Sequence, residues 1–319
     1  MKVFITRNLV GNAEQLLKKQ GIKVKVFPHE RAITRRELLK EVKDVDGLIT
    51  ILTDKIDKTV IDKMEKCKII ANCAVGFNNV DVRYARSKKI TVTNTPDILT
   101  DTTADLTVAL MIACARRFHE GIAMMRANKF EGWKPQLLLG MDIKNKIVGI
   151  IGAGRIGYAT AKRMRAFGAD VIYFNNSLNA KFNNEFNAKK VTLNTLLKTA
   201  DLISIHLPLN KETFHILNKN NLKLMKRTAI LVNTSRGEVI DEKALIELLK
   251  KKKILAAGLD VYEGEPQINP ELLDLENVLL LPHLGSATIE TRSAMAELCA
   301  KNIIDVFGGK RPLTPVHFH

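Results

Sequence analysis

Cysteine is scarce in this sequence, and its placement argues against two common uses of the residue. Four cysteines are spread over 319 residues, with no C-x-x-C pair among them. Disulfide-rich domains carry dense cysteines and zinc clusters carry paired ones, so neither is expected. The scattered thiols favour a reduced, cytoplasmic protein, and we predict no metal site. The terminal His317–His319 is expected to be a frayed tail rather than a set of metal ligands.

Aromatic residues and long apolar runs are also few. Aromatics make up 5% of the chain, and no basic stripe interleaved with aromatics accompanies the net charge of +16. Because the basic residues are spread over most of the expected helices, we predict no nucleic-acid binding. The longest helical apolar run, residues 108–115, is too short to cross a bilayer, so no membrane association is expected. A diffuse positive field would instead attract small anionic substrates and cofactors.

The sequence does contain a regular alternation of apolar, strand-like runs with helical patterns. The expected strands form a first series at residues 2–6, 24–27, 47–51, 69–72 and 91–93, and a second at 146–151, 170–174, 202–206, 229–233, 256–260 and 278–281. This alternation predicts an α/β fold with two doubly wound parallel-sheet domains. A long helical segment, Thr102–Arg117, separates the two series. Met295–Phe307 is predicted to form a helix that returns to the first domain.

A glycine-rich turn follows the first strand of the second series. Val148–Ile151 leads into Gly152-Ala153-Gly154-Arg155-Ile156-Gly157, after which a helical pattern begins. This is G-x-G-x-x-G in its strand–turn–helix setting. Its glycines permit a tight turn, close approach of the backbone to a pyrophosphate, and packing of the helix on the strand. The free N–H groups of the helix N-terminus suit the phosphates, so Gly152–Gly157 is predicted to bind a dinucleotide.

The next strand ends without the acidic residue that is typical of NAD-specific sites. Phe174 is followed by Asn175-Asn176-Ser177 where an Asp or Glu would bind the ribose 2′-OH. Asn175 can hydrogen-bond a 2′-OH and would not repel a 2′-phosphate. No arginine stands there, and the nearest downstream cation is Lys181. The cofactor is therefore expected to be NAD(H) or NADP(H), with the preference open and a lean towards tolerance of NADP(H).

Three chemically active residues each follow an apolar run in the last third of the chain. Arg236, Glu265 and His283 come after the expected strands 229–233, 256–260 and 278–281. Successive parallel strands end at the same edge of a sheet, and ligands bind in the crevice there. A guanidinium, a carboxylate and an imidazole would then lie close together. Beside a dinucleotide, this set is suited to hydride transfer with a 2-oxo acid.

These segments, together with Asn72–Asp81, Thr103–Leu106 and Trp133–Pro135, resemble the D-isomer-specific 2-hydroxyacid dehydrogenases. The resemblance covers nearly the whole chain in order, and its VGFNNVD and WKP segments are most similar to the glyoxylate/hydroxypyruvate reductase branch. It implies a Rossmann cofactor domain at residues 99–290, inserted in a flavodoxin-like substrate domain formed by residues 1–98 and 291–319. It also implies an oxidoreductase that reduces glyoxylate or hydroxypyruvate to the D-2-hydroxyacid.

The resemblance assigns catalytic roles that also make chemical sense. Arg236 would bind the substrate carboxylate and carbonyl oxygen, because a planar guanidinium suits a bidentate contact. His283 would be the general acid that protonates this oxygen as hydride reaches the carbonyl carbon. Glu265 would hydrogen-bond the far ring nitrogen of His283 and favour its protonated form. Arg236 and His283 would also contact the cofactor.

Further contacts are implied by the same resemblance. The backbone N–H groups of Val75 and Gly76 would help to hold the substrate carboxylate. The cofactor would also meet Leu207, Pro208, Thr234, Ser235, Asp260 and Gly285, with Asp260 at its nicotinamide end. Family members are generally dimers through the cofactor domain, so a homodimer is expected. Trp133 either reaches towards the active site of a partner subunit or packs within its own chain.

Two alternatives to the leading hypothesis stay open from the sequence alone. Another substrate of the same family, 3-phosphoglycerate or D-lactate, would use the same three catalytic residues. A dinucleotide-sensing binding protein, like the transcriptional corepressors that share this fold, would bind the cofactor without turnover, because fold alone does not determine function.

Overall fold

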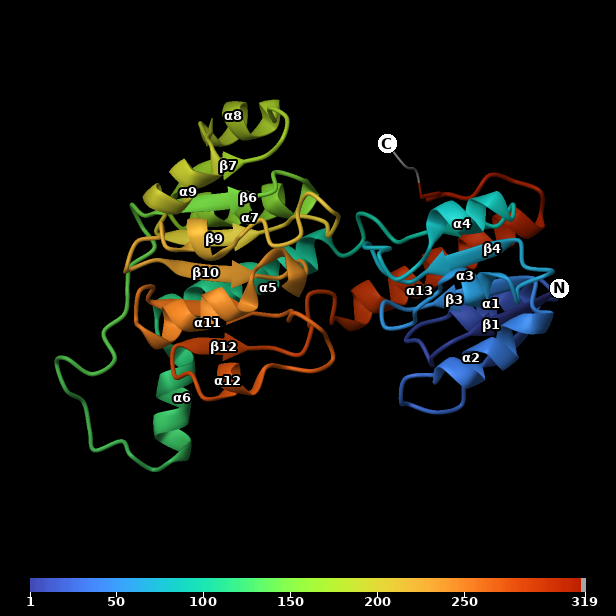
Figure 1. The fold of residues 1–319 in the computed structure, drawn as a ribbon, viewed down its shortest axis with the longest axis horizontal. Coiled ribbons are helices and arrows are strands. Elements are labelled where there is room, and N and C mark those ends of the chain that lie inside the picture. Colours follow the sequence, from blue (N-terminus) through green and yellow to red (C-terminus); the bar gives the residue numbers. More distant parts are fainter. Residues whose placement is uncertain (317–319) are drawn as a thin grey trace. The chain divides into compact units, whose positions relative to one another are not determined.

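The computed structural model describes residues 1–316, so the expected frayed tail at His317–His319 lies outside the described residues. The chain divides into two compact units (Figure 1). The first contains Met1–Leu99 and the chain from Ser286 onward, and the second contains Thr100–Gly285.

The first unit is a five-stranded parallel sheet with helices on both faces. Its elements are β1 (Lys2–Ile5), α1 (Ala13–Lys19), β2 (Lys23–Val26), α2 (Arg35–Glu41), η1 (Val42–Asp44), β3 (Gly47–Thr50), α3 (Lys58–Ile61), β4 (Ile69–Asn72), α4 (Val82–Ser87), β5 (Thr91–Thr93) and α13 (Ile289–Phe307). The strand order is β2-β1-β3-β4-β5. This order is that of flavodoxin-like folds, as predicted.

Alternating side chains of these short strands bury both faces of the first sheet. Ile49 and Ile69 belong to a cluster with residues of α1 and α13, such as Leu17 and Ile303. Leu48 and Ile70, their neighbours in sequence, belong to the opposite cluster with residues of α2, α3 and α4. Parallel strands covered on both faces read as continuous apolar runs, which explains why the sequence identified them.

The second unit is a seven-stranded, fully parallel sheet. Its elements are α5 (Thr100–Ala115), α6 (Phe118–Arg126), β6 (Ile147–Ile151), α7 (Arg155–Ala166), β7 (Asp170–Phe174), α8 (Ala180–Phe186), β8 (Lys189–Lys190), α9 (Leu193–Thr199), β9 (Leu202–Ile205), α10 (Lys219–Leu222), β10 (Ile230–Asn233), η2 (Gly237–Val239), α11 (Glu242–Lys250), β11 (Ala256–Leu259), α12 (Pro270–Leu273) and β12 (Val278–Leu280). The order β12-β11-β10-β9-β6-β7-β8 reverses direction between β6 and β9. Such a reversal is the switch point at which Rossmann domains bind dinucleotides.

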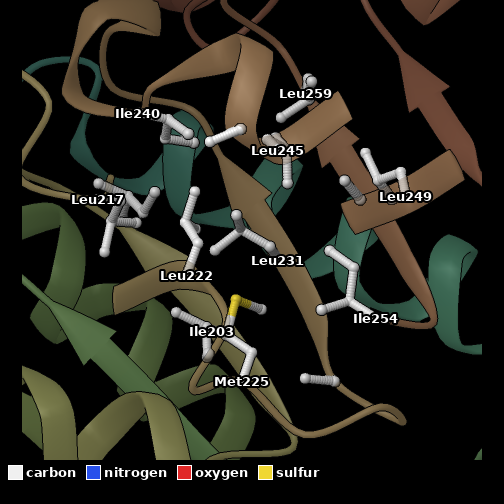
Figure 2. Close-up of a cluster of buried hydrophobic side chains, with 14 of the residues drawn as sticks. Ile203, Leu217, Leu222, Met225, Leu231, Ile240, Leu245, Leu249, Ile254 and Leu259 are labelled. Carbon is white, nitrogen blue, oxygen red and sulfur yellow. The ribbon is translucent and has the colours of Figure 1, made fainter. Parts of the chain in front are cut away.

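One face of this sheet carries the larger apolar cluster, shown in Figure 2. Ile203 and Leu231 lie near the centre of the view, with Leu222, Met225 and Leu245 from the covering segments around them. Leu202 and Ile230 point to the other face, where they join residues of α5 and α7. Two covered faces make the strands rigid, and their carboxyl ends are therefore firmly placed.

Several sequence predictions differ from the structure in their bounds. The helix expected at Met295–Phe307 begins six residues earlier, at Ile289, and the segment expected at Thr102–Arg117 forms α5 at Thr100–Ala115. The two-residue strand β8 was not predicted, since a strand of two lysines carries no apolar pattern. None of the helices within residues 1–316 is long and apolar enough to cross a membrane.

Candidate active site

The glycine loop joins β6 to α7 at the switch point of the second sheet. Gly152 has a positive φ of 96°, and a Cβ there would lie 2.7 Å from the carbonyl oxygen of His206. At Gly157, a Cβ would lie 2.2 Å from the carbonyl oxygen of Gly152, so the helix packs directly on the turn. Glycine is required at both positions, for the backbone conformation at the first and for close approach at the second.

Gly154 lies in a different environment. Apart from its chain neighbours, no described heavy atom would lie within 4 Å of a Cβ at this residue. Within the described chain, no side chain caps the start of α7, whose N-cap is Gly154. Open space beside uncapped helix N–H groups is what a pyrophosphate requires. The loop therefore fits the phosphates of a dinucleotide.

The loop after β7 is tied to the glycine loop by asparagines. Ala153 N–H donates to Asn175 Oδ1 at 3.3 Å, and Asn179 Nδ2 donates to the Ala153 carbonyl oxygen at 2.8 Å. Asn175 Nδ2 also donates to the Ser177 carbonyl oxygen at 3.1 Å. Lys190 Nζ of β8 donates to the Asn176 carbonyl oxygen at 2.8 Å. The fold thus places a cation beside Asn176 that sequence reasoning missed, because Lys190 is 14 residues further along the chain.

His206 follows β9 and precedes the predicted cofactor contacts Leu207 and Pro208. Its Nε2 lies 2.9 Å from Ser204 Oγ. Burial lowers the pKa of His206 to about 3, so the ring is neutral at physiological pH. A neutral ring beside the glycine loop adds no charge to the site.

Thr234, Ser235 and Arg236 follow β10, as the sequence predicted. The buried Asn233 holds this turn: its Nδ2 donates to the Arg236 carbonyl oxygen at 2.8 Å, and its Oδ1 accepts from Ser235 N at 3.0 Å. The Thr234 hydroxyl lies 2.8 Å from that of Thr107 on α5. Asn233 was missed as a functional residue, although an amide at a strand end directly before Thr234 was a signal available in the sequence.

Arg236 is partly buried on this turn, and its Nη1 donates to the Ser235 carbonyl oxygen at 2.6 Å. Burial lowers the pKa of Arg236, and the charges of Glu265 and Glu238 oppose that effect. An arginine stays protonated under such shifts. The turn therefore presents a permanent positive charge.

Asp260 organises the loop that carries His283. It is fully buried; its Oδ1 accepts from Leu284 N at 2.6 Å and its Oδ2 accepts from Gly285 N at 2.8 Å. The Asp260 carbonyl oxygen accepts from His283 N at 3.0 Å. Burial raises the pKa of Asp260, while the Leu284 N–H and the charge of His283 act against that rise. The structure thus gives this carboxylate a role in holding the loop, and its contact with a cofactor stays a prediction.

The side chains of Glu265 and His283 are paired directly. His283 Nδ1 lies 2.8 Å from Glu265 Oε2, and the two side chains are 27% and 28% exposed. The other oxygen, Oε1, accepts from the backbone N–H of Tyr262 at 2.9 Å. His283 has a positive φ of 55°, a conformation that non-glycine residues adopt mainly where surrounding contacts impose it. Its Nδ1 is engaged by Glu265, so the proton transfer predicted for this ring would use Nε2.

The charge state of Glu265 follows from its contacts. Burial would raise the pKa of Glu265, but the hydrogen bond and charge of His283, the Tyr262 N–H and the charge of Arg236 together bring it below the usual range. The carboxylate is therefore ionised at neutral pH. Arg236, Glu265 and His283 accordingly form one electrostatic group, as expected from three strand ends of one sheet.

The predicted substrate contacts Val75 and Gly76 lie in the first unit, directly after β4. Asn94 Nδ2 donates to the Val75 carbonyl oxygen at 2.8 Å, and Asn72 Nδ2 donates to the Gly76 carbonyl oxygen at 2.9 Å. Both carbonyl oxygens are occupied by side-chain amides, so the orientation of this turn is defined.

Trp133 is 83% exposed, which excludes the interpretation that it packs within its own chain. The described residues contain no group of three or more His, Cys, Asp or Glu side chains placed to hold a metal ion.

The chain is similar to known proteins over almost its full length. Residues 108–285 match the model of the D-isomer specific 2-hydroxyacid dehydrogenase NAD binding domain. A glyoxylate reductase of Thermococcus litoralis is 47% identical over 98% of this chain and 95% of its own. A crystal structure of a Thermus thermophilus protein superposes with a TM-score of 0.94 at 42% identity, covering 99% of this chain and all of the other.

A third similar protein was solved with ligands. It is an NADPH-dependent glyoxylate/hydroxypyruvate reductase of Sinorhizobium meliloti in complex with NADP and malonate. The TM-score is 0.85 at 30% identity, and the match covers 99% of this chain and 96% of that one.

Proposed function

The chain belongs to the D-isomer-specific 2-hydroxyacid dehydrogenase family, and we propose that within it the protein reduces glyoxylate or hydroxypyruvate to the D-2-hydroxyacid. It is an oxidoreductase that acts on a small 2-oxo acid with a nicotinamide dinucleotide. The proposal rests on the 2.8 Å contact between His283 Nδ1 and Glu265 Oε2. These two residues follow β12 and β11, and Arg236 follows β10, the next strand of the same sheet. The similarity to named glyoxylate reductases supports this substrate over 3-phosphoglycerate or D-lactate.

Each of the three residues has a separate role in the reduction. Arg236 binds the substrate carboxylate and carbonyl oxygen, and its charge stabilises the negative charge that develops on that oxygen. His283 Nε2 donates the proton to the oxygen, and Glu265 stabilises the imidazolium before transfer and orients the ring. The bound cofactor supplies the hydride that reaches the carbonyl carbon. In the oxidative direction His283 acts as the base.

For the cofactor, we propose that Gly152–Gly157 holds the pyrophosphate and that Asn175–Ser177 faces the adenosine ribose. The open space at Gly154 and the uncapped start of α7 support the first contact. For the second, Lys190 at the Asn176 carbonyl oxygen and the absence of an acidic residue from Asn175–Ser177 support tolerance of NADPH. An acidic side chain would repel a 2′-phosphate, whereas asparagine and lysine do not.

We further propose a homodimer formed through the second unit. Phe118, Ile122 and Met125 of α6 are 52%, 52% and 61% exposed and lie along a hollow of about 400 Å³. Large apolar side chains gathered on one helix are typical of an interaction surface. Trp133, which follows α6 and is more exposed still, would take part in the same contact. The free thiols of the four cysteines support a cytoplasmic location.

The test follows NADH and NADPH oxidation by the purified protein with glyoxylate, hydroxypyruvate, pyruvate and 3-phosphohydroxypyruvate. We expect glyoxylate or hydroxypyruvate to give the highest kcat/KM. His283→Ala should mainly lower kcat, whereas Arg236→Ala should also raise the KM of the 2-oxo acid steeply. Cofactor binding without turnover of any 2-oxo acid would favour the dinucleotide-sensing alternative. Near-normal kinetics of either variant would refute the assigned roles.

A further inference from the structure

The turn after β4 has an unusual pattern of hydrogen bonds. The Ala74 carbonyl oxygen accepts from Thr95 N–H at 2.9 Å, and the Val75 carbonyl oxygen accepts from Asn94 Nδ2 at 2.8 Å. Two successive carbonyl groups thus face the same segment, residues 94–95. In an extended strand, successive carbonyl groups point in opposite directions, and backbone donors of one neighbouring segment could satisfy only one of them. The side chain of Asn94 is what turns the second carbonyl to the same side.

The direction of these carbonyl groups also fixes the direction of two N–H groups. In a trans peptide, the C=O and the following N–H point to opposite sides of the same plane. The Ala74 carbonyl therefore sets the Val75 N–H, and the Val75 carbonyl sets the Gly76 N–H. Both N–H groups must point away from residues 94–95. Within the part of the chain that the structure describes, neither donates a hydrogen bond.

The side chain of Asn72 fixes the orientation of the following peptide group, whose carbonyl belongs to Gly76. Its Nδ2 donates to the Gly76 carbonyl oxygen at 2.9 Å, and its Oδ1 accepts from Asn79 Nδ2 at 3.2 Å. Asn79 Nδ2 also lies 3.1 Å from the Ile51 carbonyl oxygen. Asn72 is fully buried, so this bracing is shielded from water.

Asn94 is itself held in place by its backbone. Its carbonyl oxygen accepts from Thr314 Oγ1 at 2.6 Å, and its N–H donates to the Thr314 carbonyl oxygen at 3.3 Å. The buried Asn302 of α13 in turn holds Thr314 through its Nδ2 and Oδ1. The donor of Asn94 therefore reaches Val75 from a fixed backbone.

We propose that Asn94 is a positioning residue for the substrate, with Asn72 in support. By holding the Val75 carbonyl group, Asn94 keeps the Gly76 N–H beside that of Val75, so that two N–H groups bind one substrate carboxylate. This inference rests on the proposed reduction of a 2-oxo acid.

The kinetic test compares Asn94→Asp and Asn94→Ala with the wild type. Asn94→Asp keeps the shape of the side chain but replaces the donor with an oxygen acceptor. Because this oxygen would face the Val75 carbonyl oxygen, the peptide group between Val75 and Gly76 should rotate away from it. Hydrogen bonds to a charged group account for roughly 10- to 100-fold in affinity. We therefore expect the KM of glyoxylate to rise about 10-fold or more, while kcat and the KM of the cofactor change less than about 3-fold. Val92→Ala, in the strand that precedes Asn94, controls for loss of stability.

A binding measurement separates this inference from the proposed reaction. In protein labelled with ¹⁵N-glycine, the Gly76 amide signal is assigned by its absence from Gly76→Ala and followed as oxamate is added. We expect it to shift in the wild type and not in Asn94→Asp. Wild-type KM in both Asn94 variants, or an equal rise of KM in Val92→Ala, would overturn the positioning role. If the wild type reduces no 2-oxo acid, the proposed function fails, and the oxamate titration alone then decides whether the Gly76 N–H binds a carboxylate.

Discussion

Two glycines of the same loop should respond in opposite ways to the same substitution. A methyl group added at Gly157 would lie 2.2 Å from the carbonyl oxygen of Gly152 and 2.9 Å from Ile150 Cγ2. A methyl group at Gly154 would have no described heavy atom within 4 Å apart from its chain neighbours. The structure therefore predicts that Gly157→Ala damages the fold, whereas Gly154→Ala damages the binding of the cofactor.

The magnitudes follow from these contacts. Alanine favours a helix interior over glycine by about 1 kcal/mol, but a clash with backbone costs about 1–3 kcal/mol or more because a carbonyl group cannot rotate away. Since its neighbour is backbone and not a flexible side chain, Gly157→Ala should destabilise the second unit by about 2 kcal/mol. For a unit of this size, that corresponds to a Tm lower by about 4–8 °C. Gly154→Ala changes only the N-cap of α7 and should move Tm by less than about 2 °C.

The assay measures thermal unfolding by circular dichroism without cofactor, and the Kd of NADH and NADPH by their fluorescence. We expect Gly154→Ala to weaken cofactor binding by about 10-fold or more, because the methyl group occupies the space that the pyrophosphate needs. Gly308→Ala, at the C-terminal end of α13 in the first unit, is the control, since its methyl group would meet its nearest atoms at ordinary contact distances of 3.4 Å and more. Unchanged cofactor affinity of Gly154→Ala would refute the placement of the pyrophosphate. Unchanged Tm of Gly157→Ala would refute the tight contact between α7 and the turn.

Three further outcomes are expected. Glu265→Gln removes the charge that pairs with His283, so kcat for reduction should fall by about 10-fold or more while the KM of the cofactor changes little, and an unchanged kcat would contradict the pairing. His283 and its neighbours lower the pKa of Glu265, so the ionised carboxylate stabilises the fold above the unfolded-state pKa of roughly 4.3, and that contribution is lost as pH falls through the lower folded-state pKa. The Tm difference between wild type and Glu265→Gln should therefore be largest above about pH 5 and shrink as the pH falls further. Met125→Glu on α6 should shift the protein towards monomer in sedimentation velocity, whereas Leu273→Glu, at a residue equally exposed on α12, should not.

The sequence allowed most of the fold to be predicted, because its strands are buried on both faces. A strand such as Ile147–Ile151 is apolar throughout, and this leaves a run that is visible without any structure. The turn at Gly152–Gly157 could be recognised in the sequence because close backbone contacts allow only glycine at Gly152 and Gly157. The strand β8 has neither property, and Lys190 was therefore overlooked beside Asn176.

Parts of the candidate site could not be predicted because they depend on contacts between distant segments. Nothing in the sequence shows that the Asp260 carboxylate accepts the N–H groups of Leu284 and Gly285, more than twenty residues later. Likewise, the amide of Asn94 reaches the Val75 carbonyl group across 19 residues. A hydrogen bond of this kind leaves no periodic pattern, since it depends on the path of two loops in space.

The sequence by itself therefore determined the fold class, the glycine-rich turn at Gly152–Gly157 and the order of Arg236, Glu265 and His283 after successive strands. These features arise from burial and from local backbone geometry, which constrain residue types along short stretches of chain. Only the tertiary structure decided which nitrogen of His283 faces Glu265, what the Asp260 carboxylate holds, and which carbonyl groups are held at Val75 and Gly76. Each of these features depends on where a single polar atom points, and this orientation is fixed only when distant segments of the chain pack together.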